Sequence, residues 1–414
     1  MPIFIIIMLE LLMPAGNLKK LKTAFHFGAD AVYVGGKSFS LRAYADNFTE
    51  DELRDGVEYA HSLGKKVYVT VNIFAKNADL DAARKYFAFL QNIGADAVLI
   101  SDLGLLAICK EVAPTLAIHI STQANTTNVE TVKFYKNLGV KRVVLARELG
   151  YDEIAEIHNT VPDVELEAFV HGAMCMSFSG RCLLSSYFSG RSANRGECIQ
   201  PCRWNYTITE TERHADKPLD VEEDERGTYF MNSRDLRLLS HIPEIAKAGI
   251  VSLKVEGRMK SEFYVATVAN AYRHAIDEYL ASGKIKNERT YNEWLETVAH
   301  RTYTDAYFEG DNLNTICTDE GQQPEKYVFT AVVKSVEDGK AVVEMRNRFK
   351  TGDRLTVLSP NDNANGKKFV VDKIFDGDEI TDDAKLVQHV YSLACPDGIT
   401  EGDLLLKDAV MPRR

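Results

Sequence analysis

Four cysteines in one short stretch are the side chains of this sequence best suited to binding a metal. Cys175, Cys182, Cys198 and Cys202 lie between Glu167 and Trp204, spaced as C-x6-C, a gap of fifteen residues, and C-x3-C. Thiolates select zinc, copper(I) or iron–sulfur clusters. Structural zinc sites usually carry tight C-x2-C pairs, which this stretch lacks, whereas iron–sulfur ligands vary more in spacing. The spacing favours an iron–sulfur cluster over zinc, and buried thiols without a metal are the third interpretation.

The same stretch permits a second kind of chemistry, nucleophilic catalysis by a cysteine. His171 precedes Cys175 by four residues, so a thiolate–imidazolium pair is conceivable. Such pairs usually assemble from segments far apart in the chain. The sequence contains neither a GxSxG nor an HExxH motif. A peptidase with Cys175 or Cys182 as nucleophile is therefore the alternative hypothesis.

A repeated pattern earlier in the chain predicts the elements that position these side chains. A glycine closes a stretch of helical spacing and precedes a Val/Ile-rich run at Gly28, Gly64, Gly94, Gly139 and Gly249. Candidate strands lie near residues 8–13, 31–35, 67–73, 97–101, 117–121, 142–146, 165–171 and 252–256. Eight such βα units predict an α/β fold, a closed (β/α)8 TIM-like barrel, with an open doubly wound sheet as the alternative.

The pattern divides the chain into three parts. Residues 1–283 form the predicted barrel with the cysteines, residues 284–326 a connector, and residues 327–414 a small antiparallel β domain with alternating runs. Residues 207–228 form a strongly acidic insertion, which we expect to be a solvated loop or hairpin. The small domain carries no catalytic constellation, so we expect the chemistry in the barrel.

Polar residues follow the predicted strands, at the end of such barrels where active sites lie. They are Asn17, Lys37, Asn72, Ser101, Asp102, Ser121, Thr122, Gln123, Arg147, Glu148, His171, Glu256 and Arg258. Asn17 and Asp102 resemble helix caps. Together the others predict a polar pocket facing the cysteine segment.

Composition limits the partners. The 414 residues carry a formal net charge of −11, which disfavours a basic coat for nucleic acid but allows a confined basic patch. Candidates for that patch are Arg181, Arg191, Arg195 and Arg203. The apolar N-terminal run is too short to span a membrane and lacks a basic leader. We expect a cytoplasmic protein without a membrane or DNA partner, in which the cysteines are free thiols or metal ligands.

Several motifs resemble the signature of the U32 peptidase, or collagenase-like, family. They are EAFVHGAMC ending at Cys175, SGRCLLS ending at Ser185, NRGECIQPCR ending at Arg203, LMPAGN ending at Asn17, STQ ending at Gln123 and KVEGR ending at Arg258. The resemblance covers roughly residues 8 to 310. The C-terminal β region also resembles one that some members carry.

The resemblance implies more than peptidase chemistry. Members include tRNA hydroxylation proteins that form 5-hydroxyuridine at the wobble position with prephenate, a ribosomal RNA cytidine hydroxylase and ubiquinone hydroxylation proteins. Several bind a 4Fe–4S cluster through four cysteines, which match Cys175, Cys182, Cys198 and Cys202 here. Some members take a ligand near Asn232, where an asparagine cannot replace it, so Cys202 is the expected fourth ligand. A barrel with one small β domain looks most like the tRNA hydroxylation group.

Prephenate is a dicarboxylate, so arginines are its expected ligands. The candidates are Arg147, Arg181, Arg195, Arg203 and Arg258. The sequence does not identify the catalytic residues, for which the candidates are His171, Glu167, Arg147 and Glu256.

The sequence thus supports three hypotheses about function. The first is an iron–sulfur-dependent RNA hydroxylation enzyme acting on tRNA. The second is a U32-type peptidase, and the third is a zinc-stapled accessory subunit without chemistry of its own. The oligomeric state is not determined by the sequence.

Overall fold

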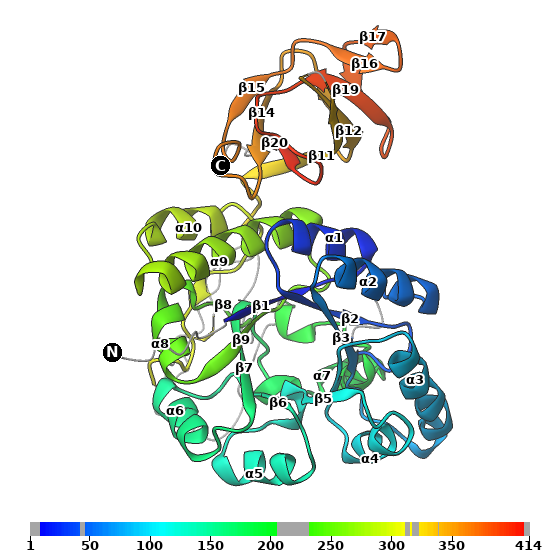
Figure 1. Cartoon of the computed structure of the whole chain (residues 1–414), viewed down its shortest axis with the longest axis vertical. Helices are drawn as coiled ribbons and strands as arrows, with labels where there is room; N and C mark the ends of the chain where they lie inside the picture. The colour runs from blue at the N-terminus through cyan, green and yellow to red at the C-terminus, as the bar shows by residue number, and fades with distance from the viewer. Residues whose placement is uncertain are drawn as a thin grey trace, which may run out of the picture.

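Eight parallel strands close into a barrel in the computed structural model, which describes residues 9–41, 46–204, 232–310, 315–316, 323–337 and 339–409 (Figure 1). The strands are β1 (Glu10–Pro14), β2 (Ala31–Gly35), β3 (Lys66–Val71), β4 (Ala97–Ile100), β5 (Ala117–Ile120), β6 (Arg142–Val144), β7 (Glu165–Ala173) and β9 (Ile250–Val255). Strand β9 pairs in parallel with both β1 and β7, which closes the ring. The predicted barrel is confirmed, and the open sheet is excluded. The acidic insertion at 207–228 and Cys317 lie outside the described residues.

Helices surround the strands in the order that the sequence predicts. They are α1 (Leu18–His26), α2 (Glu50–Ser62), α3 (Leu80–Asn92), α4 (Leu103–Val112), α5 (Val129–Asn137), α6 (Tyr151–Thr160), α8 (Ile242–Lys247) and α9 (Glu262–Ser282). Gly28 and Gly249 have φ of 96° and 89°, values that favour glycine and that let the chain leave the preceding helix. Asn17 and Asp102 cap α1 and α4 by accepting the backbone N–H groups of Lys20 and Leu105, as expected.

One element was not expected, a strand that runs against the barrel direction. Strand β8 (Asp235–Arg237) pairs antiparallel with the end of β7, and β10 (Tyr303–Thr304) pairs with β8. Strand β7 is nine residues long, so its last residues extend past the barrel and offer a free edge. A buried ion pair between Arg301 and Asp235, at 2.7 Å, fixes the connector to this edge.

The base of the barrel interior carries a network of paired charges. Glu167 accepts a hydrogen bond from Lys254 Nζ at 2.7 Å and one from Arg142 at 3.2 Å. Arg142 also contacts Glu10 at 2.5 Å and Glu165 at 2.7 Å. Because buried charges must be paired, this network forms a fixed polar floor beneath the barrel mouth.

The C-terminal region is a separate antiparallel β domain, as predicted. Its strands are β11 (Tyr327–Glu337), β12 (Lys340–Met345), β13 (Phe349–Lys350), β14 (Arg354–Leu358), β15 (Lys368–Val370), β16 (Ile374–Asp376), β17 (Glu379–Thr381), β18 (Asp383–Ala384), β19 (Val390–Ala394) and β20 (Leu404–Asp408). The domain packs beside α1 and α9, and α10 (Glu288–Leu295) lies next to α9 (Figure 1). Arg346 pairs with Glu262 at 3.1 Å across this contact.

Within the described ranges, no helix has the length and apolar character needed to cross a membrane.

Candidate active site at the barrel mouth

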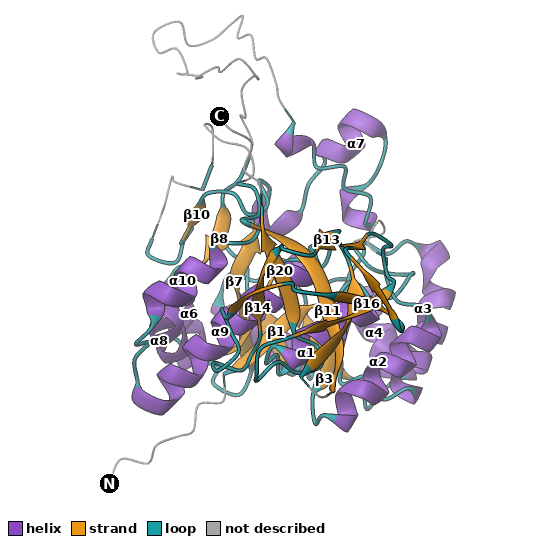
Figure 2. Cartoon of the chain, turned by 90° about the horizontal axis from the view of Figure 1, so that it is seen from above, coloured by secondary structure: helices purple, strands orange, loops and turns teal. Residues whose placement is uncertain are grey.

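A cap formed by residues 174–204 follows β7 and covers one end of the barrel. It contains η3 (Phe178–Gly180), α7 (Leu184–Ser189), η4 (Ala193–Arg195) and η5 (Pro201–Arg203). In Figure 1 α7 lies over the barrel interior, and in Figure 2 it stands away from the barrel. Three glycines with positive φ, Gly180, Gly190 and Gly196, let the chain reverse direction between the cysteines.

The four cysteines meet in one cleft beneath this cap. Cys175, Cys182, Cys198 and Cys202 all line a cleft of about 360 Å³. Ser185, which is fully buried, directs its hydroxyl at the Cys198 sulfur, 3.8 Å away. The tertiary structure thus brings together thiols that are separated by up to 27 positions in the sequence.

The spacing of the thiols bears on the metal that they fit. Among the described residues, no three of these sulfur atoms lie within 4.8 Å of one another. A single zinc ion with Zn–S bonds of about 2.3 Å requires sulfur atoms roughly 3.8 Å apart. A four-iron cluster binds each cysteine at a different iron atom and therefore needs wider spacing. The four thiols that line the cleft are the residues that could hold either kind of metal centre.

Burial and the neighbouring thiols both raise the pKa of two of the four cysteines, Cys175 and Cys202. Partial desolvation is the largest cause that raises the pKa of Cys175, although this residue borders the open cleft, and the nearby Cys182 and Cys198 add to it. Desolvation also raises the pKa of Cys202, followed by the effect of Cys175. Without a cation Cys175 and Cys202 therefore favour the thiol form, and a bound metal would offset this preference.

A smaller inner pocket continues the cleft toward the barrel axis. Its lining includes Asn72, Ser121, Thr122, Gln123, Arg147, Lys254, Glu256 and Arg258. Most of these residues follow β3, β5, β6 and β9 and belong to the predicted polar strand ends. Arg147 and Glu256 line both spaces, so they lie at the junction between the thiols and the barrel interior.

Two arginines of the inner pocket are held in defined positions. Arg147 donates to the Ala173 carbonyl at 2.8 Å, lies 3.7 Å from Glu256, and stacks over the Phe169 ring at 3.8 Å. Arg258 donates to Thr70 Oγ1 at 2.9 Å. A Cβ at Gly35 would lie 2.1 Å from the Arg258 guanidinium, so glycine there is required for this placement. Both guanidinium groups can meet a carboxylate that enters the pocket.

The other predicted arginines divide into two groups. Arg203 lines the thiol cleft. Arg195 binds Asp79 through two contacts of 2.9 and 3.2 Å, and Arg181 donates to the Gln123 carbonyl at 2.9 Å. Neither Arg181 nor Arg195 lines either space. Their contacts fasten the cap to the barrel.

Two predicted catalytic candidates lie outside both spaces. Glu167 is fully buried in the charged floor. His171 is buried between Tyr264, Tyr272 and Tyr303, and desolvation places its pKa well below the ordinary value, so the ring is neutral. His171 therefore faces tyrosines, and no histidine of the described chain lines the thiol cleft.

Other site residues were not singled out from the sequence. Lys254 lines the inner pocket, and its signal was a single charge within the apolar strand β9. Ser179 donates its backbone N–H and its hydroxyl to the two oxygens of Glu148, at 2.6 and 2.7 Å. This pair anchors the start of the cap to the end of β6.

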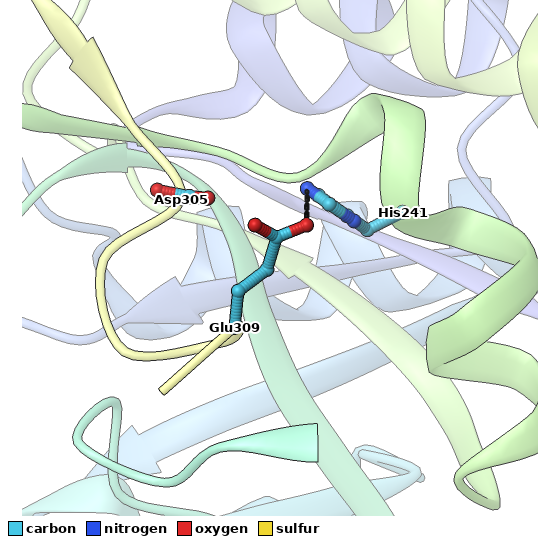
Figure 3. Close-up of side chains that lie close together, drawn as sticks. All are labelled: His241, Asp305 and Glu309. Atoms are coloured by element: carbon cyan, nitrogen blue, oxygen red, sulfur yellow. Dashed lines mark ion pairs between the residues drawn. The ribbon is translucent and has the colours of Figure 1, made fainter. Parts of the chain in front are cut away.

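A separate group of possible metal ligands lies on the flank of the barrel. His241, Asp305 and Glu309 bring one ligand atom each within 4.8 Å of the others (Figure 3). Glu309 is 65% exposed and 3.8 Å from His241. The sequence did not predict this group. Exposed carboxylates often gather in this way without an ion, so we assign it no role.

Fold and site together define a (β/α)8-barrel protein with a thiol-lined cleft over the ends of its strands. Residues 16–316 match Peptidase family U32, and residues 325–405 match the Peptidase family U32 C-terminal domain. The chain therefore belongs to peptidase family U32, as the motifs predict.

Relatives of two kinds, tRNA hydroxylation proteins and a collagenase, are similar to most of the chain. It is 42% identical to tRNA hydroxylation protein P1 of Bacillus subtilis (strain 168), over 85% of this chain and 83% of the relative. It is 39% identical to tRNA hydroxylation protein P of Haemophilus influenzae, over 96% and 95%. It is also 33% identical to a collagenase of Porphyromonas gingivalis, over 80% of each chain.

Proposed function

We propose that this chain is an RNA hydroxylation enzyme that acts on tRNA. In this proposal it forms 5-hydroxyuridine at the wobble position, with prephenate as co-substrate and a 4Fe–4S cluster bound by the four cysteines. The observation that carries the proposal is that Cys175, Cys182, Cys198 and Cys202 share one cleft above a pocket lined by arginines. The relatives named tRNA hydroxylation proteins, similar along most of the chain, support the class of substrate.

A cluster at the thiols would supply electron transfer or activate the hydroxyl donor. The chain's own residues position the reactants. Arg147 and Arg258 are fixed by Ala173 and Thr70, so each presents a guanidinium edge of set direction to a dicarboxylate. The polar floor below them cannot move without exposing buried charge, which keeps this geometry constant.

The cleft has a size suited to one base. Its volume of about 360 Å³ lies in the usual range for pockets that bind small groups and is too small for a duplex. A base must leave its stack to be modified, and an anticodon loop already presents unpaired bases. We therefore place the target base in the thiol cleft and a carboxylate of the co-substrate at Arg147 and Arg258, where the cleft continues into the inner pocket of about 70 Å³.

The cleft also bears on the two rival functions. In a peptidase, Cys175 or Cys182 would need a base, and no histidine in the described part of the chain lines the cleft. A zinc-stapled accessory subunit would bind its ion through the same four thiols, so the metal content of the purified protein distinguishes it from the proposal.

The test analyses nucleosides from the tRNA of cells that lack this gene and carry a plasmid copy. We expect 5-hydroxyuridine and its derivatives with the unsubstituted chain, and their loss with Cys182→Ser or Cys198→Ser. Cys395→Ser is the control, because Cys395 lies in the β domain outside the cleft.

The same variants, purified without oxygen, are assayed for iron and acid-labile sulfide. We expect about four of each per chain in the unsubstituted protein and in Cys395→Ser. Protein without iron, with all four thiols open to alkylation, would remove the cluster from the proposal. If the tRNA of the complemented strain stayed unmodified, tRNA would be ruled out as the substrate.

A further inference from the structure

The cap that carries the cysteines exposes an unusual group of aromatic side chains. Tyr187 is 83% exposed, Phe188 43% and Trp204 42%. Tyr187 and Phe188 lie on α7, and Trp204 follows η5. Aromatic side chains bury large apolar areas, so leaving three of them in water on one short segment forfeits stability. Such a group indicates a surface that contacts a partner.

The three rings form a continuous series. The centroids of Tyr187 and Phe188 are 5.1 Å apart, and those of Phe188 and Trp204 are 5.7 Å apart. Trp204 directly follows Arg203 and Cys202, which line the thiol cleft. The series therefore leads from the rim of the cleft out along α7.

Charge identifies the kind of partner. Residues 174–204 contain four arginines and one glutamate, whereas the whole chain has a net charge of −11. Within this segment positive charge thus exceeds negative charge, although Arg195 is paired with Asp79 of the barrel. Arginines interleaved with exposed rings suit single-stranded nucleic acid, whose phosphates meet the cations while the bases stack on the rings.

We propose that Tyr187, Phe188 and Trp204 form a stacking platform for unpaired RNA bases next to the nucleotide in the thiol cleft. This inference rests on the proposed function for its class of substrate and adds the residues that hold the loop. Stacking on a ring tolerates any base, because every base has a flat face. The platform therefore binds an unpaired loop of any sequence, and the cleft selects the base that is modified.

The test measures binding of an RNA hairpin with an unpaired loop, and of a fully paired duplex of equal length, to the anaerobic holoprotein. The chain has two tryptophans, so in a Trp294→Phe background the fluorescence reports Trp204 alone. We expect the hairpin, and not the duplex, to quench this fluorescence. The Kd of every variant is measured by the anisotropy of a fluorophore on the RNA, which also reports binding where Trp204 is replaced. Tyr187→Ala and Trp204→Ala should each raise the Kd for the hairpin about 5- to 100-fold.

Two further variants separate stacking from a structural role. Trp204→Phe keeps a flat ring and should restore most of the affinity. Phe134→Ala removes a ring that is 51% exposed on α5, away from the cap, and should leave the Kd unchanged. Iron content is measured for every variant, so that loss of binding with intact iron is assigned to the platform.

Unchanged hairpin binding by Tyr187→Ala and Trp204→Ala, together with no quenching of Trp204 in the Trp294→Phe protein, overturns the platform. If those variants bind RNA normally but lose binding to a protein from the same cells, the surface belongs to a protein partner and the inference is also overturned. In both cases the nucleoside analysis still decides the proposed function separately.

Discussion

At the scale of single residues, two buried histidines contribute to the dependence of the fold's stability on pH. His119 and His171 are 2% and 1% exposed, and desolvation, as the largest cause, holds the pKa of each ring well below its ordinary value of 6.5. The unfolded chain binds protons at these rings near pH 6.5, while the folded chain does not. We expect the free energy of unfolding to fall below pH 6.5 by up to about 1.4 kcal/mol per pH unit for each ring. Urea titrations at pH 7.5, 6.5 and 5.5 measure it.

Substitution separates this effect from other acid-sensitive groups. His119→Asn should remove about half of the slope that the two rings contribute, and adding His171→Asn should remove the remainder. Above pH 7 neither change should alter the slope. A slope that stays the same in the double variant would show that other groups cause the acid sensitivity.

At the scale of elements, the cap depends on a few contacts with the barrel. Arg195 joins η4 to Asp79 of η1 (Asn77–Asp79) through two contacts, and its Nη1 also donates to the Phe74 carbonyl at 2.8 Å. The hydrogen bond from Arg195 is the largest cause that lowers the pKa of Asp79. The pair is partly exposed, so we assign it about 1 kcal/mol. Asp79→Asn should therefore speed hydrogen exchange in residues 190–199 roughly fivefold.

Hydrogen exchange of the backbone amides, measured by mass spectrometry, tests directly how much this contact stabilises the cap. The matched control is Arg54→Met, which breaks the exposed pair with Asp51 on α2, at 3.0 Å. That change should leave exchange in the cap unaltered. Equal exchange in Asp79→Asn and the unsubstituted chain would mean that other contacts, such as Ser179 with Glu148, hold the cap alone.

At the scale of the whole molecule, the β domain is a fixed part of the barrel rather than a tethered module. Arg346 and Glu262 pair at 3.1 Å, with side chains 14% and 13% exposed. Leu358, Leu404 and Leu406 belong to the same apolar core as the barrel. In a double-mutant cycle with Arg346→Met and Glu262→Gln, we expect a coupling energy of about 1–2 kcal/mol in the free energy of unfolding.

The corresponding cycle on Arg54 and Asp51 is the reference and should give no more than about 0.5 kcal/mol. Limited proteolysis of the connector gives an independent readout, because weaker docking exposes it. A coupling near zero between Arg346 and Glu262 would mean that apolar contacts alone hold the two domains together.

The local part of this structure was predictable because short-range patterns determine it. The strands after Gly28, Gly64, Gly94, Gly139 and Gly249 lie where the apolar runs predict them. The caps at Asn17 and Asp102 were recognisable because a side chain three residues from its partner N–H needs no tertiary contact. The cysteine segment was likewise placed after the seventh strand, where the structure has it.

Strand β8, the charged barrel floor and the environment of His171 were not predictable in this way. Strand β8 depends on the exposed end of β7, which is visible only when the barrel is closed. His171 stands four residues from Cys175, but its partners Tyr264, Tyr272 and Tyr303 come from segments about 90 to 130 residues away. The alternation of side chains along β7 and the position of α9 decide which side of the barrel sheet this ring faces.

The sequence alone therefore determined the fold class, the family and the stretch that carries the thiols. Only the tertiary structure decided that the four thiols share one cleft, and that Arg147 and Arg258 lie beneath it while Arg181 and Arg195 fasten the cap. The reason is physical. Element type follows from the spacing of neighbouring residues, whereas a site forms where strands distant in the sequence are brought side by side by closure of the barrel.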